Sequence, residues 1–271
     1  MADAESRRWR LLIETASALI PCPLQAVEFR AITRHGKTRP VVLLCTDGTY
    51  EKEYVVKGRG EIIHAKGHIH PKTLFNDHVV GRLGVAMGAP VADVELIEIP
   101  DVLIQMNWSM AHLLGGIAHG SRLIPMTTDA ETVLHCGLPE NGTRFSLLAI
   151  LFGWIHVEED LQFIYDRTPP QLVHSVDHGD CFPNGPNWRV SDLAATKTVA
   201  PLDAITTACG LGETALRQAA EALRTIEDGT IAAALSAPPA EWLVPLDERV
   251  ALAMYLSRRR DQLLALLLPD K

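Results

Sequence analysis

The sequence predicts an α+β fold in which a sheet-rich part, residues 15–125, precedes a mainly helical part, residues 126–271. Short β-branched and apolar runs broken by turn residues fill the first part. Long apolar runs with helical spacing and capping residues fill the second. Because 271 residues suffice for one large domain and no repeat or low-complexity segment interrupts the chain, we treat residues 1–271 as a single domain.

The composition is that of a folded protein, with 47% hydrophobic and 21% charged residues. A net charge of −8 provides no overall positive field that would collect nucleic acid or an anionic membrane. The five cysteines are scattered without a C-x-x-C pair, which favours reduced thiols in a cytoplasmic protein. The N-terminal apolar run contains Glu14 and is too short to span a bilayer, so we interpret it as an amphipathic surface helix. We expect neither nucleic acid nor membrane as a partner.

Three strand-like runs open the sheet-rich part, at 24–34, 40–46 and 53–57. Turn residues at 35–37 and 47–48 separate them, which predicts a three-stranded antiparallel meander. Apolar residues at helical spacing then predict a helix over 71–88, ended by a glycine and a proline. The run VADVELIEIP at 91–100 is typical of a fourth strand, and SRLIPM at 121–126 indicates a fifth.

The helical part begins with a strongly apolar helix over 145–160. Two short strand candidates follow, at 161–166 and 171–177, and their spacing predicts a β-hairpin. Capping and turn residues then delimit further helices, at 201–210, 212–226, 228–238, 239–244 and 245–268. The last helix carries the basic run SRRRDQ at 257–262, which we interpret as a solvent-exposed helix face.

Three polar residues on these elements indicate phosphoryl transfer. A strand that ends in Lys57, a following helix with Asp77, and a hairpin that ends in Asp177 occur in the order of the parts of a protein kinase. In that arrangement the lysine places its charge on ATP phosphates, the first acid holds the ammonium, and the second binds magnesium. Gly179 would let the backbone turn away. Taken singly, each residue could instead be an ordinary strand end, helix-surface residue or turn residue.

Five stretches in this order resemble the HipA-like kinase family, relatives of bacterial Ser/Thr toxin kinases. They are DGTYEKEYVVK at 47–57, the segment 74–100, HGSRLIP at 119–125, VDHGDCFPNGPNW at 176–188, and the C-terminal PAEWLVP with YLSRRRDQLLALL. The resemblance implies a two-lobed, protein-kinase-like fold, with a small sheet-rich N-lobe (15–125) and a larger helical C-lobe (126–271) that carries the hairpin. It also implies that ATP binds between the lobes, with Lys57 on phosphate and Asp177 on magnesium.

The same resemblance suggests that Gly120, Ser121 and Arg122 line or close the nucleotide cleft. A plain turn that enters a strand is the alternative interpretation of these three residues.

One segment departs from the family pattern. At the end of the apolar helix such kinases carry W-I-x-N-x-D-R-H-x-x-N, in which the Asp accepts the proton of the substrate hydroxyl and the last Asn binds a second magnesium. Here the segment is WIHVEEDLQFIYD, residues 154–166, which lacks the Arg-His pair. Asp160 is then the candidate base, with Glu159 or Glu158 as substitutes. Gln162, at the place of the Asn, is a candidate metal ligand.

The sequence therefore predicts an ATP- and magnesium-dependent phosphotransferase that acts on a hydroxyl, with Ser or Thr of a protein as the expected acceptor. Two alternatives stay open: a nucleotide-binding pseudokinase that acts as a regulatory or scaffolding module, and a small-molecule kinase. A protein regulator is a further partner to consider. His64, His68 and His70 could hold a transition metal, but no cysteine or carboxylate completes the set, so a loop near the phosphates is the better interpretation.

Overall fold

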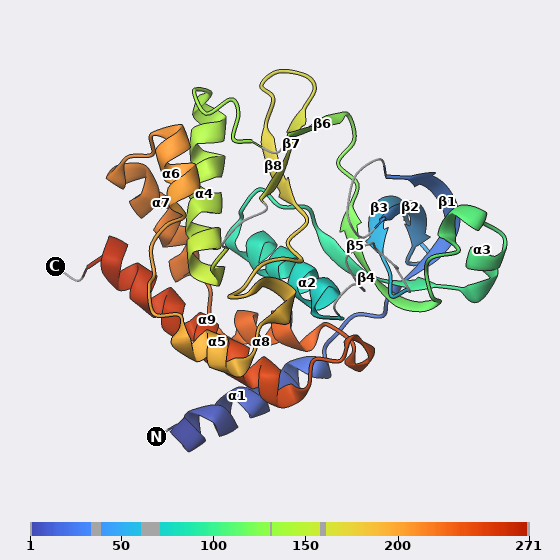
Figure 1. Ribbon diagram of the computed structural model, residues 1–271, viewed down its shortest axis with the longest axis horizontal. Coiled ribbons are helices and arrows are strands. Elements are labelled where there is room, and N and C mark those ends of the chain that lie inside the picture. The colour runs from blue at the N-terminus through green and yellow to red at the C-terminus, as the bar shows by residue number, and fades with distance from the viewer. Residues whose placement is uncertain (1, 34–38, 61–70, 131, 158–160, 270–271) are drawn as a thin grey trace.

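The computed structural model describes residues 2–33, 39–60, 71–130, 132–157 and 161–269. Figure 1 shows a β-barrel at one side, helices at the other, and a small upright sheet between them. The mixed α+β class predicted from the sequence is confirmed.

Five strands form the barrel, and their pairing explains its closure. The strands are β1 (Leu24–Ile32), β2 (Val41–Thr46), β3 (Glu51–Lys57), β4 (Val94–Ile99) and β5 (Gly116–Arg122). The first three are successive antiparallel neighbours, as predicted, and β5 lies antiparallel to both β3 and β4. A short parallel pairing of β1 with β4, which the sequence did not indicate, closes the barrel. The fifth strand also lies earlier than the predicted 121–126.

Alternate residues of these strands point into the barrel and form its own apolar core, the periodicity of two expected for a strand. Val41, Leu43 and Cys45 of β2 are buried there beside Tyr54 and Val56 of β3. The helix α3 (Asp101–Gln105) and a 3₁₀ turn, Trp108–Met110, add Met110 and other residues to the same core.

The second sheet has three antiparallel strands, β6 (Thr127–Ala130), β7 (Gln162–Asp166) and β8 (Val173–Val176). The hairpin of β7 and β8 is the one predicted from the sequence. The strand β6 follows β5 after a short linker, 123–126, so the chain passes directly from the barrel to this sheet. By the strand register, β6 begins opposite Asp166 at the end of β7, and Val176 at the end of β8 pairs with Gln162 at the start of β7.

Helices build the rest of the molecule around α4 (Pro139–Ile155), whose C-terminal half is buried throughout. The others are α1 (Ala2–Ser17), α2 (Pro71–Met87), α5 (Val190–Ala195), α6 (Asp203–Cys209), α7 (Glu213–Arg224), α8 (Asp228–Ser236) and α9 (Leu246–Leu267). The segment 239–244, predicted as a helix, contains only the 3₁₀ turn Ala240–Trp242. Within the described ranges, no helix is both long and apolar enough to cross a bilayer.

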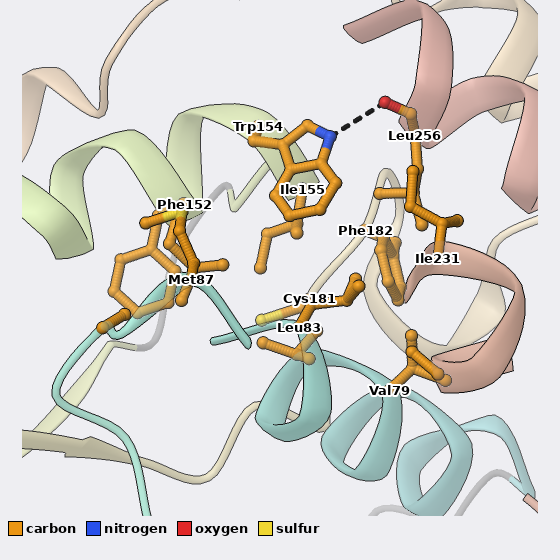
Figure 2. Packing of buried hydrophobic residues seen from close by; sticks show 14 of the residues in the cluster. Val79, Leu83, Met87, Phe152, Trp154, Ile155, Cys181, Phe182, Ile231 and Leu256 are labelled. Atoms are coloured by element: carbon orange, nitrogen blue, oxygen red, sulfur yellow. Dashed lines mark hydrogen bonds between the residues drawn. The ribbon is translucent and has the colours of Figure 1, made fainter. Parts of the chain in front are cut away.

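The helix α2 packs into the large apolar core. Figure 2 shows Val79, Leu83 and Met87 of this helix facing side chains that come from α4 and from the segment that follows β8. Trp154 of α4 also donates its indole N–H to the carbonyl of Leu256, 2.8 Å away. Since each buried apolar side chain contributes about 1.5–3 kcal/mol, this packing fixes α2 relative to the end of β8.

From the sequence we interpret the basic run of α9 as a solvent-exposed helix face, but part of this run is buried. Arg259 is only 1% exposed. Its guanidinium donates to the carbonyls of Gly153 (2.6 Å) and Trp154 (2.7 Å) in the last turn of α4, and to that of Thr198 (2.8 Å). These carbonyls near a helix end need partners from outside the helix, so Arg259 is a structural cap.

Candidate active site

Lys57 lies between two carboxylates that come from distant parts of the chain. Its ammonium donates to Oδ2 of Asp77 and to Oδ1 of Asp177, each at 2.6 Å. The side chains of Lys57 and Asp77 are 7% and 2% exposed, whereas that of Asp177 is 25% exposed. The structure therefore brings together the three residues that the sequence placed on a strand, a helix and a hairpin.

The segment after β8 is fastened to α2 by polar side chains. Asn76 donates to the carbonyls of Gly179 and Cys181, both at 3.0 Å, and accepts a bond from the indole of Trp188. The backbone N–H of His178 donates to Oδ1 of Asp77 at 3.0 Å. As a result, Asp77 of α2 is bonded both to Lys57 at the end of β3 and to His178 in the segment after β8.

The sharp turn at the end of β8 lies at Asp177 itself, which has a φ of 61°. Only a few per cent of non-glycine residues adopt this region, and Asp is among those that tolerate it. Gly179 serves a different purpose from the turn predicted for it: a Cβ there would lie 2.5 Å from Cγ2 of Thr73. Its lack of a side chain allows the loop to approach the first turn of α2.

A cleft of about 750 Å³ opens between the barrel and the three-stranded sheet. Among the predicted site residues, it is lined by Lys57, Ser121, Arg122, Gln162 and Asp177. Gly120 is not among its lining residues. A Cβ on Gly120 would lie 2.5 Å from Cγ1 of Ile97, so this glycine is required for packing inside the barrel.

A groove of about 880 Å³ lies elsewhere, between α1 and the segment 236–249. Apart from Glu14 and Arg249, its described lining carries no ionisable side chain. The chemistry-bearing residues therefore belong to the cleft at Lys57.

The charges around Lys57 keep the site ionised. Burial alone would lower the pKa of the Lys57 ammonium, but the charges of Asp77 and Asp177 outweigh burial and raise this pKa. Burial alone would likewise raise the pKa of Asp77, but Lys57, with help from His119 and His178, holds that pKa below its usual range. At neutral pH, the lysine is thus cationic and its buried partner anionic.

Three buried histidines surround Asp77, and sequence reasoning did not identify them. His119 Nε2 lies 3.4 Å from Oδ2 of Asp77, and His178 Nδ1 lies 3.7 Å from its Oδ1. His78 follows Asp77 in α2 and contacts His119. Burial, which Asp77 offsets only in part, lowers the pKa of His119 to about 4, and burial lowers the pKa of His78 and of His178 as well. All three are neutral at pH 7.

We expect the protein to lose stability as the pH falls from about 6.5 to about 4. The unfolded chain protonates His119 near its ordinary pKa of 6.5, whereas the folded protein resists protonation down to about 4, so the unfolded chain binds more protons in this window. This difference between the two pKa values corresponds to about 3 kcal/mol of folding stability, which is lost by the time the pH reaches about 4. Urea denaturation at several pH values measures the profile. His119→Gln should flatten it, and an unchanged slope in that variant would contradict the assignment.

Some predicted residues lie outside the described part of the chain: Asp160 with Glu158 and Glu159, and His64 with His68 and His70. Gln162 is described, and it is the cross-strand neighbour of Val176, the residue before Asp177. Among the described residues, no group of three or more histidine, cysteine or carboxylate side chains is arranged to hold a metal by itself.

Comparisons with known proteins identify a matching family and a similar fold. Residues 26–157 match the model of a family described as HipA-like kinase. Among solved structures, the proinflammatory kinase CtkA of Helicobacter pylori is similar in fold, with a TM-score of 0.58 and 10% sequence identity over 89% of this chain and 94% of that chain. A search of curated proteins gives no match. The resemblance noted in the sequence is thereby confirmed: residues 26–157 match the HipA-like kinase family.

Proposed function

We propose that this protein is an ATP- and magnesium-dependent phosphotransferase that transfers a phosphoryl group to the hydroxyl of Ser or Thr in a protein. The observation that carries the proposal is the buried Lys57, held by Asp77 and Asp177 at the wall of a 750 Å³ cleft. A fixed ammonium beside a partly exposed carboxylate suits a polyphosphate and its metal ion.

In this proposal the barrel and the helical part act as the two lobes of a kinase, and ATP lies in the cleft between the barrel and the three-stranded sheet. Val42, Val55 and Ile164 give the cleft apolar walls suited to a flat base. The linker residues Leu123 and Ile124 also line it, so that backbone groups are near the edge of such a base. The phosphates would then extend toward Lys57 and Asp177.

The residues present fit a magnesium ion. Mg²⁺ prefers oxygen ligands and is commonly bound through one or two carboxylates together with substrate phosphates and water. Asp177 supplies a carboxylate that reaches the cleft, and Gln162 supplies an amide oxygen from the neighbouring strand. When bound, the ion would offset the negative charge of the phosphates.

The residues of the chain have separate roles. Lys57 donates to phosphate oxygens, and Asp77 keeps that ammonium charged and oriented. A carboxylate of the segment 158–160, with Asp160 as the first candidate, accepts the proton from the attacking hydroxyl. Since phosphoryl transfer requires little covalent chemistry from the protein, positioning and charge account for most of the catalysis.

A nucleotide-binding pseudokinase is the second candidate, because the segment 154–166 lacks the Arg-His pair of active relatives. Asp160→Asn distinguishes the two. An active kinase should lose turnover in this variant and keep its affinity for MgATP, whereas a pseudokinase has no turnover to lose. Incubation with protein and small hydroxyl acceptors then distinguishes a protein kinase from a small-molecule kinase.

Calorimetric titration with MgATP tests the proposal directly. We expect the wild-type protein to bind, and Asp177→Asn to bind about 10–100-fold more weakly, the cost of losing one charged contact. Asparagine tolerates the positive φ at this position, so the loss would not reflect backbone strain. The matched control is Asp203→Asn, at an exposed carboxylate in the first turn of α6. Absence of MgATP binding by the wild-type protein would contradict the proposed function.

A further inference from the structure

A pair of buried histidines lies beside the Lys57–Asp77 ion pair. His119 on β5 is the cross-strand neighbour of Lys57, and His78 follows Asp77 on α2. Both side chains are fully buried. Their rings are nearly perpendicular, with Nδ1 of one 3.3 Å from Nδ1 of the other.

The contacts fix the direction of the hydrogen bonds. A neutral imidazole has one N–H, so the contact between the two Nδ1 atoms requires that one of them donates and the other accepts. Nε2 of His119 lies 3.4 Å from Oδ2 of Asp77, a carboxylate oxygen that can only accept, and 3.0 Å from Oγ of Ser121, a hydroxyl that can donate or accept. If this Nε2 were bare, its lone pair would face a carboxylate oxygen.

The partner ring leads to the same assignment. Nε2 of His78 has no hydrogen-bond partner among the described residues, and the ring packs edge-on against Trp242 at 5.7 Å. A buried N–H without a partner is rarer in proteins than a buried acceptor without one. His78 therefore carries its proton on Nδ1 and donates it to Nδ1 of His119, which leaves the proton of His119 on Nε2.

We propose that His119 is a positioning residue: oriented by the N–H of His78, it directs its Nε2–H toward Asp77 and Ser121 and so holds the Asp77 carboxylate against Lys57. Asp77 then accepts from Lys57 on Oδ2, which also lies 3.4 Å from Nε2 of His119, and from the backbone of His178 on Oδ1. Because Ser121 lines the cleft, the same imidazole also connects the ion pair to the cleft wall.

This arrangement has a consequence for the nucleotide. Without the contact from His119, the Asp77 carboxylate can rotate, and Lys57 is held chiefly by Asp177. A lysine held in that way competes with the metal ion for the carboxylate of Asp177. The inference rests on the proposed function in this respect, since it assigns Lys57 to the phosphates.

The first test does not depend on nucleotide. Long-range ¹H–¹⁵N correlation spectra of the wild-type protein with ¹⁵N-labelled histidine, at pH 7, report the protonated nitrogen of each ring. The signals among the eleven histidines are assigned from His78→Gln and His119→Gln. We expect the proton on Nδ1 of His78 and on Nε2 of His119. The opposite order, or two cationic rings, would overturn the inference.

The second test uses MgATP affinity and rescue by a conservative variant. His119→Leu should bind MgATP about tenfold more weakly than the wild type, the loss expected for one hydrogen bond to a charged group. His119→Gln, whose amide N–H₂ can take the place of Nε2–H, should stay within about threefold of wild type. His174→Leu is the control, since that histidine contacts Asp166 and Arg144 instead.

The outcomes separate the two proposals. If the wild-type protein does not bind MgATP, the proposed function fails, and the tautomers still decide the arrangement of the histidines. If wild type binds and His119→Leu binds equally well, the positioning role is wrong. A loss in His119→Gln as large as in His119→Leu would also overturn it, because it would indicate packing alone.

Discussion

Lys57→Met is expected to lower the free energy of unfolding by about 3–5 kcal/mol, in addition to its loss of MgATP affinity. The substitution keeps most of the volume of the side chain and removes its charge. Asp77, whose side chain is 2% exposed, then remains as a buried anion that accepts from the His178 backbone N–H, with the neutral rings of His119 and His178 at 3.4 Å and 3.7 Å. The larger part of the cost comes from this unpaired carboxylate, since Asp177 is open enough to be hydrated.

Adding Asp77→Asn to Lys57→Met should recover most of the lost stability. The amide oxygen can still accept from the backbone of His178, and no buried charge remains. Urea denaturation of the single and double variants measures both effects. The control is Lys52→Met, at an exposed position on the same strand, whose free energy of unfolding should stay within about 0.5 kcal/mol of wild type. A Lys57→Met protein as stable as this control would show that Asp77 is not a buried anion.

Arg259→Met is expected to destabilise the protein by about 3–5 kcal/mol. Three carbonyls, those of Gly153, Trp154 and Thr198, lose their guanidinium donor, and the first two belong to buried residues. Each orphaned acceptor costs about 1–3 kcal/mol, and the C-terminal end of α4 also loses a nearby positive charge. Thermal or urea unfolding followed by circular dichroism measures the change.

The neighbouring Arg258→Met is the matched control, because Arg258 is exposed and donates to one carbonyl, that of Leu193. We expect it to cost below about 1 kcal/mol. Arg259→Lys should recover only part of the loss, since an ammonium does not reproduce the planar fork of donors. If Arg259→Met and Arg258→Met lose the same amount of stability, Arg259 is not the cap of α4.

Local patterns in the sequence were sufficient for the elements that carry the site. Apolar spacing and a terminal glycine predicted the helix over 71–88, and α2 extends from Pro71 to Met87. Turn residues and β-branched runs predicted the hairpin of β7 and β8. The order of Lys57, Asp77 and Asp177 on these elements predicted a common site, and the three side chains do meet.

Features that depend on partners far apart in the chain could not be predicted in this way. The barrel closes through only two parallel residue pairs, Leu24 with Ile97 and Gln25 with Glu98, which leave no local signal. His119 and His78 carry no local signal in the sequence, because their contact forms only when β5 and α2 lie side by side. Arg259 lies in a basic run of the kind that is normally solvent-exposed, and its burial depends on α4.

The packing of α1 against α8 and α9 has a consequence for synthesis on the ribosome. Trp9 and Ile13 are buried in the large core, and Arg8 pairs with Asp228, 220 residues later. At about 5–20 residues per second, roughly 10–40 s pass before those partners are made. The barrel, whose strands all lie within residues 24–122, can complete its own core in that time. The helix α1 is therefore translated well before the partners that bury it, and its Trp9 is an early candidate for chaperone contact.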